Sequence, residues 1–307
     1  MHLLRKRITI LILVIGMGSI ILISFRFGKQ IFASTMNNLE DKNVEFSGKR
    51  SYEDLQYQVS LGPRTPGSQA HQQCLEWIRM QLTDSGWDVS VQESTYMNYP
   101  VRNIIAKKGS GNDLIILGAH YDSRFRADHD PEQSNHILPV PGANDGASGV
   151  AVLLELARTL QIRSDQTIWL VFFDFEDQGR IEGMDWIIGS SAFVETLTEI
   201  PQAVVIIDMS GDKSLNIFQE QNSDPMLSND IWNKADELGY GDIFLAKLKY
   251  RILDDHIPFL NKGIPAIDII DFDYPYCHTV EDTVDRTSPA RHVVVGSTLW
   301  HWIADTY

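Results

Sequence analysis

The sequence is poor in cysteine and in basic side chains. Its 307 residues include only two cysteines, Cys74 and Cys277, which excludes a disulfide scaffold and a metal site made of cysteines alone. The two lie far apart in the chain, and we expect them to stay unpaired. Lysine and arginine number 26 against 41 aspartates and glutamates, for a net charge of −15. Because such a surface repels phosphate backbones, nucleic acid is not an expected partner.

A long uncharged apolar run lies near the N-terminus, at residues 8–24, directly after a basic cluster at residues 5–7. The run is about long enough for a helix that spans a bilayer. The basic cluster predicts a cytoplasmic N-terminus and an extracytoplasmic body. Residues 31–33 resemble a weak signal-peptide cleavage site, so secretion is the alternative. We therefore expect a membrane anchor at residues 1–29, a polar stalk at 30–50 and one domain at 51–307.

Within the predicted domain, apolar runs typical of strands alternate with helical patterns. The expected strands are residues 103–107, 114–120, 167–174, 203–208 and 266–270. The expected helices are residues 69–84, 147–161, 186–196, 225–238 and 289–304. This alternation predicts an α/β fold with a mostly parallel central sheet and helices on both faces.

Polar side chains stand where the predicted strands end, which is where open α/β sheets bind ligands. One aspartate also lies in a glycine-rich turn before a buried helix. Taken singly, each has an ordinary role, such as a buried histidine or a turn-forming aspartate, but together they favour a metal site. Mixed imidazole and carboxylate ligands without thiolate suit zinc with one open position. The candidate residues are His120, Asp145, Glu176, Asp177, Asp208 and His278.

The motifs around these residues resemble those of the M28 family of zinc peptidases, over about residues 55–305. The resemblance implies a zinc aminopeptidase-like fold, with Asp145 able to bridge two ions and Glu176 at the position of the general base. The motifs, in the family's order, are His120-Tyr-Asp-Ser, Gly142-Ala-Asn-Asp-Gly-Ala-Ser-Gly149, Phe172-Phe-Asp-Phe-Glu-Asp177, Asp208-Met and His278-Thr. The positions that match metal ligands of the family are His120, Asp145, Asp177, Asp208 and His278.

The resemblance includes two chemistries. Aminopeptidases of the family use two zinc ions to activate a water molecule. Glutaminyl-peptide cyclotransferases use one zinc ion and convert an N-terminal glutamine to pyroglutamate with release of ammonia. The segment 254–260, Asp-Asp-His-Ile-Pro-Phe-Leu, is similar to the cyclase branch, because Asp254 stands where peptidases usually carry a small residue. Cys277 departs from animal cyclases, which carry a tryptophan before the last zinc histidine.

The cyclase resemblance implies a role for each candidate residue. It implies that Asp145, Asp177 and His278 hold the single zinc ion. Glu176, Asp208 and Asp254 are then the catalytic residues, with Glu176 carrying the proton from the attacking amine to the leaving ammonia. Trp186 is the expected aromatic wall for the glutamine side chain.

We therefore predict a zinc-dependent glutaminyl-peptide cyclotransferase that acts on the N-termini of peptides or proteins. The first alternative is an aminopeptidase, in which His120 and Asp208 belong to a second zinc site. The second alternative is a peptide-binding protein on the same scaffold without metal.

Overall fold

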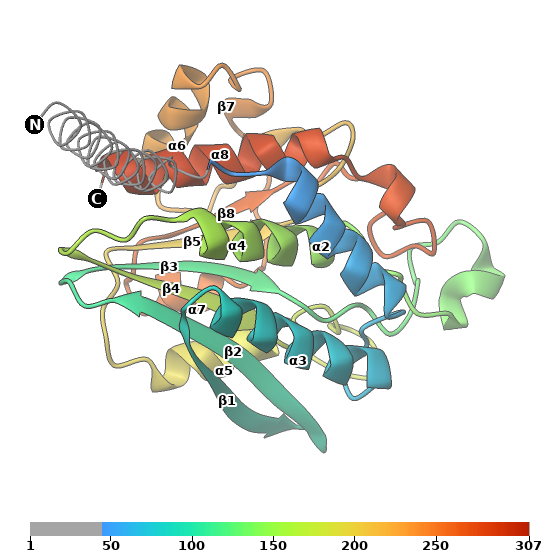
Figure 1. Cartoon of the computed structure of the whole chain (residues 1–307). Helices are drawn as coiled ribbons and strands as arrows, with labels where there is room; N and C mark the ends of the chain where they lie inside the picture. Colours follow the sequence, from blue (N-terminus) through green and yellow to red (C-terminus); the bar gives the residue numbers. More distant parts are fainter. Residues whose placement is uncertain (1–44, 307) are drawn as a thin grey trace, which may run out of the picture. The chain divides into compact units, whose positions relative to one another are not determined.

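A six-stranded sheet forms the centre of the protein, with strand order β1-β2-β4-β3-β5-β8 (Figure 1). The structure is a computed structural model in which residues 45–306 are described. Strands β4, β3, β5 and β8 are parallel to one another, whereas β2 is antiparallel to both β1 and β4. The strands are β1 (Asp88–Tyr96), β2 (Tyr99–Gly109), β3 (Asp113–His120), β4 (Gln166–Phe173), β5 (Ala203–Asp208) and β8 (Ala266–Ile270).

The α/β prediction is confirmed, but the sheet is mixed because a hairpin extends one edge. Met97 and Asn98 connect β1 to β2 with positive φ angles of 48° and 69°, as in a tight two-residue hairpin turn. Strand β1 was not predicted. Its side chains are exposed or half-buried along its whole length, so its sequence lacks the apolar run by which the inner strands are recognised.

Helices cover both faces of the sheet, as expected. Alternate side chains of β3 divide between the two faces: Ile115 and Leu117 belong to the larger core, and Leu114 and Ile116 to the smaller one. The larger core is covered by α3 (Gln69–Asp84), α4 (Ala147–Thr159), α6 (Pro225–Glu237) and α8 (Pro289–Thr306), and α2 (Gly48–Ser60) lies against α4 and α8 (Figure 1). The smaller core is covered by α5 (Ile188–Thr196) and α7 (Ile257–Asn261).

The remaining elements are short. They are the parallel pair β6 (Ile217–Gln219) and β7 (Phe244–Leu248) and the 3₁₀ helices η1 (Gln133–Ile137) and η2 (Val284–Arg286). Two helix starts follow the local sequence closely. The Ser68 side chain accepts a hydrogen bond from the backbone of His71 at the start of α3. Asp224 caps α6, with Pro225 as the first helical residue.

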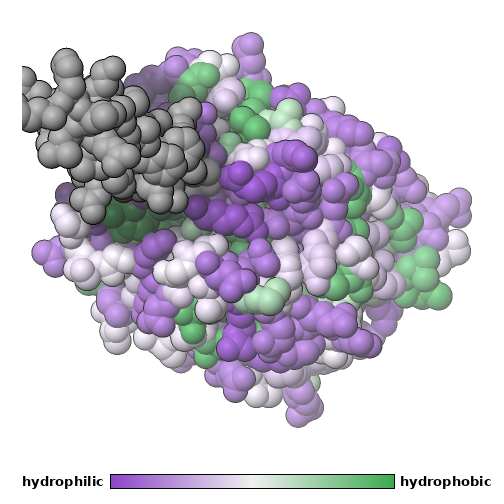
Figure 2. Space-filling view, in the orientation of Figure 1, coloured by the Kyte–Doolittle hydropathy of each residue, from purple (hydrophilic) through white to green (hydrophobic). Residues whose placement is uncertain are grey.

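The predicted membrane anchor (1–29) and most of the predicted stalk (30–50) lie outside the described residues. Among residues 45–306, no helix has the length and apolar character needed to cross a bilayer. Helix α2 begins at Gly48, a few residues before the predicted start of the domain. The face shown in Figure 2 is mostly hydrophilic, with apolar residues scattered over it rather than joined in a belt.

Candidate metal centre

Every candidate residue lies near the carboxyl ends of the parallel strands. His120 is the last residue of β3 and Asp208 the last of β5, while Glu176 and Asp177 form the turn after β4. The other candidates are in loops, before α4, before α7 and after β8. A cavity of about 380 Å³ opens at this edge, within the usual range for ligand pockets. Its lining includes Asp145, Glu176, Asp177, Trp186, Asp208, Asp254 and His278.

Two of the residues predicted to hold zinc, Asp145 and Asp177, each lie close to the third, His278. Its Nε2 lies 2.9 Å from Asp177 Oδ1 and 3.6 Å from Asp145 Oδ2. Two ligand atoms about 2.0–2.1 Å from one zinc ion lie about 3.3 Å apart in a tetrahedral site, so each carboxylate is near enough to the imidazole to share an ion with it. The three side chains are not among the groups of described residues whose ligand atoms all lie within 4.8 Å of one another, so the two carboxylates would have to move closer together to bind one ion. Asp177 Oδ2 is buried and has no hydrogen-bond partner among the described residues. A cation would satisfy that oxygen, and the donor set therefore fits zinc.

Asp145 also belongs to a second group. His120 Nε2 lies 3.1 Å from Asp145 Oδ1 and 3.2 Å from Asp208 Oδ1, with all three side chains nearly or fully buried. One oxygen of Asp145 thus faces His278 and the other faces His120. Asp145 thus stands between possible donors for one ion beside His278 and for a second beside His120, where the ligand atoms of His120, Asp145 and Asp208 all lie within 4.8 Å of one another, so these donors are compatible with both chemistries.

Burial and crowded carboxylates set the charges in this region. Burial alone would lower the pKa of His120, but contacts with Asp122, Asp145 and Asp208 raise it well above its ordinary value. Burial raises the pKa of Asp208 to about 7, and the neighbouring His120 offsets part of that effect. Burial also raises the pKa of Glu176 well above its ordinary value, and Asp254 adds to the shift. A raised pKa makes a carboxylate a better proton acceptor, and the carboxyl group formed can return the proton.

Asp254 also lines the cavity, and its neighbour there, Asp208, is held by two contacts. Asp208 Oδ1 accepts a hydrogen bond from the Met209 backbone at 2.7 Å and contacts His120. Asp254 accepts a hydrogen bond from the Asp255 backbone. After burial, the charge of Asp254 is one of the causes that raise the pKa of Asp208.

Two further aspartates, which the sequence did not reveal as functional, hold the turns that carry the candidate residues. Asp122 accepts hydrogen bonds from the backbone of Glu176 at 3.1 Å and of Asp177 at 3.4 Å. Asp282 accepts from the backbone of Asp145 at 3.2 Å. Both are fully buried, and their hydrogen bonds to these backbone groups fix the direction of the Asp145, Glu176 and Asp177 side chains. Nothing in the spacing of Asp282 distinguishes it from a loop aspartate.

The backbone at the strand ends is unusual. Phe175, Met209 and His278 have φ angles of 59°, 41° and 58°, in a region that residues other than glycine rarely adopt. Each is either a candidate ligand or the neighbour of a candidate residue. Such conformations persist where surrounding structure enforces them, and they concentrate at functional sites.

An aromatic stack forms one wall of the cavity. The Trp186 ring lies parallel to the His278 ring, at a centroid distance of 5.8 Å and an interplanar angle of 17°. The guanidinium of Arg124, which also lines the cavity, lies over the Trp186 ring, with its Cζ 4.7 Å from the ring centre. His129 also packs against His278, at 4.6 Å. Trp186 therefore lines the cavity, as predicted, whereas Arg124 and His129 were not assigned a role from the sequence.

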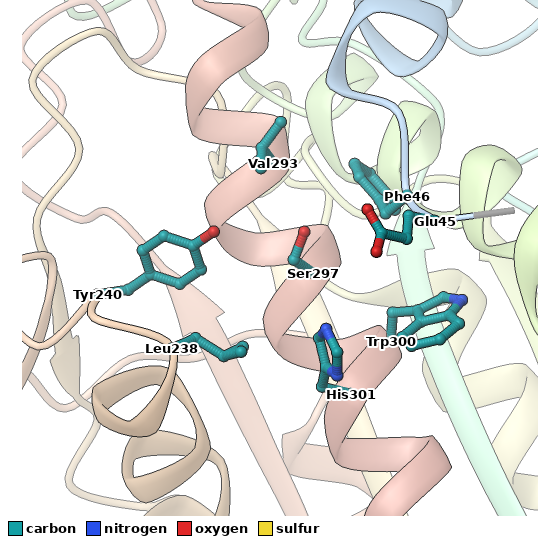
Figure 3. Close-up of a pocket in the computed structure, with 8 residues that line it drawn as sticks. All are labelled: Glu45, Phe46, Leu238, Tyr240, Val293, Ser297, Trp300 and His301. Atoms are coloured by element: carbon teal, nitrogen blue, oxygen red, sulfur yellow. The ribbon is translucent and has the colours of Figure 1, made fainter. Parts of the chain in front are cut away.

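Both cysteines are unpaired, as expected. Cys74 is buried in the core, and Cys277 lines the cavity with its Sγ 3.8 Å from Asp145 Oδ2. A second and smaller cavity, of about 250 Å³, lies between α8 and the segment after α6 (Figure 3). Tyr240, Ser297 and His301 contribute its polar groups together with Glu45. It is smaller than typical ligand pockets, so the chemistry is expected at the larger one.

Comparisons with known proteins identify the family and the overall fold. The model of peptidase family M28 matches residues 103–303. Aminopeptidase YwaD of Bacillus subtilis is 27% identical over 81% of the chain, and the chain spans only 55% of that protein's length. Glutaminyl-peptide cyclotransferase of Boiga irregularis is 26% identical, with 76% of each chain covered. The crystal structure of Tannerella forsythia glutaminyl cyclase is 32% identical with a TM-score of 0.80, covering 86% of this chain and all of that one.

Proposed function

Because the chain belongs to peptidase family M28, we propose that it is a glutaminyl-peptide cyclotransferase, which converts an N-terminal glutamine to pyroglutamate. The observation that carries the proposal is Asp254. It is an aspartate at 4% exposure, it lines the cavity, and its charge raises the pKa of Glu176 and of Asp208. Three acidic groups around one cavity suit a substrate that enters with a free α-amine.

The reaction requires a proton to move between two nitrogen atoms. The α-amine attacks the side-chain amide carbon, a carbon–nitrogen bond forms there, and the bond to the amide nitrogen breaks to release ammonia. Zinc, when bound by Asp145, Asp177 and His278, polarises the amide carbonyl as a Lewis acid. Glu176 accepts the proton from the attacking nitrogen and donates it to the leaving nitrogen, for which a raised pKa is suited.

The other cavity residues bind and orient the substrate. Asp208 and Asp254 supply negative charge for the α-ammonium group before it loses its proton. Trp186 supplies an apolar ring beside His278, against which the methylene groups of the glutamine side chain pack. No water nucleophile is needed in this scheme.

An aminopeptidase is the second candidate, and the His120, Asp145 and Asp208 group favours it. Their three ligand atoms lie within 4.8 Å of one another, which suits a second ion beside the first. Glu176 would then take a proton from the attacking water.

One experiment separates the candidates. The zinc-loaded protein is incubated with a glutaminyl peptide, with ammonia release measured by a coupled assay, and in parallel with leucine p-nitroanilide. Cyclisation without anilide hydrolysis, at about one zinc per chain, supports the cyclotransferase. Anilide hydrolysis without cyclisation, at about two zinc ions per chain, supports the aminopeptidase. Neither activity after incubation with excess zinc would favour the third candidate, the peptide-binding protein without metal.

We also propose that residues 8–24 anchor the enzyme in a membrane with its catalytic domain outside the cytoplasm, where it meets peptide N-termini. The basic cluster before the run supports this orientation. Fractionation of cells that express the full chain tests it. The protein should remain in the membrane pellet after alkaline carbonate washing, and a protease added from outside should reach the domain. Release of a shortened soluble protein would instead indicate a cleaved signal peptide.

A further inference from the structure

We propose that Arg124 is a positioning residue of the zinc site, because it supports two zinc-ligand side chains that come from different loops. The inference rests on the zinc site of the proposed function. It does not depend on whether that site cyclises glutamine or hydrolyses peptides.

The first support is to Asp177. Arg124 Nη1 donates a hydrogen bond to the Asp177 carbonyl oxygen at 3.0 Å and lies 3.4 Å from Asp177 Oδ1. Its Nη2 donates to the carbonyl oxygen of Gly179 at 3.0 Å. The planar fork of the guanidinium therefore holds the turn that carries Asp177 at two points of the backbone and one of the side chain.

The second support is to His278, through Trp186. The guanidinium lies over the indole ring, which is itself stacked on the imidazole. Removal of the guanidinium would take away a contact of the Trp186 ring, and that ring in turn contacts the His278 imidazole. Arg124 thus acts on one zinc ligand by hydrogen bonds and on the other through an aromatic stack.

Arg124 is itself held firmly. Its Nε and Nη2 donate to the two carboxylate oxygens of Asp128 at 2.7 and 2.8 Å, and its side chain is 1% exposed. A fixed positive charge this close to a cation site opposes metal binding by simple repulsion. We therefore expect its shape and hydrogen bonds, rather than its charge, to matter for metal affinity.

Lysine separates these two contributions, because it keeps the positive charge but lacks the planar fork and the flat surface. The test compares Arg124→Lys and Arg124→Gln with the wild-type protein. Arg158→Gln is the matched control. Arg158 is also largely buried and bonds to the carboxylates of Asp54 and Glu155, but these residues do not line the cavity.

Two quantities are measured on metal-free protein: the zinc dissociation constant, by competition with a chromophoric chelator, and the stability against urea. Arg124→Lys and Arg124→Gln should both bind zinc about 10–100-fold more weakly, the usual loss when a partner of a metal ligand is removed. Arg158→Gln should lose stability without a change in zinc affinity. If Arg124→Gln does not fold, Arg124→Lys carries the test.

Several results would overturn the inference. Wild-type zinc affinity in Arg124→Gln would show that the fork and the stack are dispensable. Full affinity in Arg124→Lys would show that charge alone suffices. An equal loss of affinity in Arg158→Gln would reduce the effect to general destabilisation. A wild-type protein that binds no zinc removes the site and the inference together, whereas zinc binding without cyclisation would count only against the proposed reaction.

Discussion

Trp186 lies face to face with His278, at a centroid distance of 5.8 Å, and lines the same cavity. The ring thus contacts a proposed zinc ligand and borders the space for the substrate. We expect Trp186→Ala to lower kcat/KM about ten-fold, with a higher KM, since an aromatic stack contributes about 0.5–1.5 kcal/mol beyond its buried area. Trp186→Phe should have a kcat/KM between those of the wild type and of Trp186→Ala. Steady-state kinetics on a glutaminyl peptide measure this, and an unchanged kcat/KM in Trp186→Ala would argue against both roles.

Gly179 allows Trp186 to occupy its place. A Cβ atom at Gly179 would lie 2.0 Å from Cδ2 of the indole, far inside contact distance. Gly179→Ala should therefore displace the ring and reproduce much of the Trp186→Ala defect.

The double variant tests whether the clash is the cause. In a Trp186→Ala background, Gly179→Ala should lower kcat/KM little further, because the indole ring with which the new Cβ atom would clash is gone. If the loss of kcat/KM in the double variant equals the product of the two single losses, Gly179 acts on another part of the turn.

Glu176 is expected to carry the transferred proton. Glu176→Gln should lower kcat by about 10²–10⁴-fold, the usual contribution of a positioned acid or base. Zinc content should be unchanged, because Glu176 is not one of the proposed zinc ligands. Metal analysis and turnover are measured on the same preparation. A variant that loses zinc in proportion to its activity would make Glu176 a ligand rather than a base.

Asp254 distinguishes the two candidate reactions. Asp254→Ser removes a buried negative charge that raises the pKa of Glu176 and of Asp208. Cyclisation should fall strongly, whereas hydrolysis of an aminoacyl anilide, if the wild type has any, should fall much less. Asp254→Asn serves as the control that keeps the size of the side chain. Equal losses in both reactions, or none, would indicate that Asp254 serves only to begin α7.

Much of the fold followed from local patterns. The apolar run of β5 ends at Asp208 in both the prediction and the structure, since a buried parallel strand leaves a continuous apolar signal. Strand β1 was missed because it lies at the edge of the sheet, half exposed, where no such run is required. The sequence also gave no reason to expect an antiparallel hairpin there instead of another parallel strand.

The candidate ligands were recognisable because they follow strands, and strand ends meet at one edge of the sheet. The residues that orient them were not. Arg124 and Asp282 act through contacts with backbone groups remote in sequence, and such contacts leave no spacing pattern.

His292, which lies outside the proposed active site, is expected to make the free energy of unfolding depend on pH. It is fully buried in α8, and its Nδ1 lies 2.7 Å from Ser51 Oγ. Burial lowers the pKa of His292 from 6.5 to about 3, so the folded protein keeps the ring neutral while the unfolded chain takes up a proton below pH 6.5. Stability is therefore lost as the pH falls through this window, by about 1.4 kcal/mol per pH unit for one proton.

His292→Gln removes the group that takes up this proton but can keep a hydrogen bond to Ser51. Urea unfolding of both proteins at about pH 7.5 and about pH 5 measures the difference, and other titrating groups contribute to both alike. The wild type should lose about 2 kcal/mol more than the variant over this range. An equal loss of stability in the wild type and in His292→Gln would mean that His292 becomes protonated within the folded protein. The buried ring would then have gained a partner for its Nε2, which has none among the described residues.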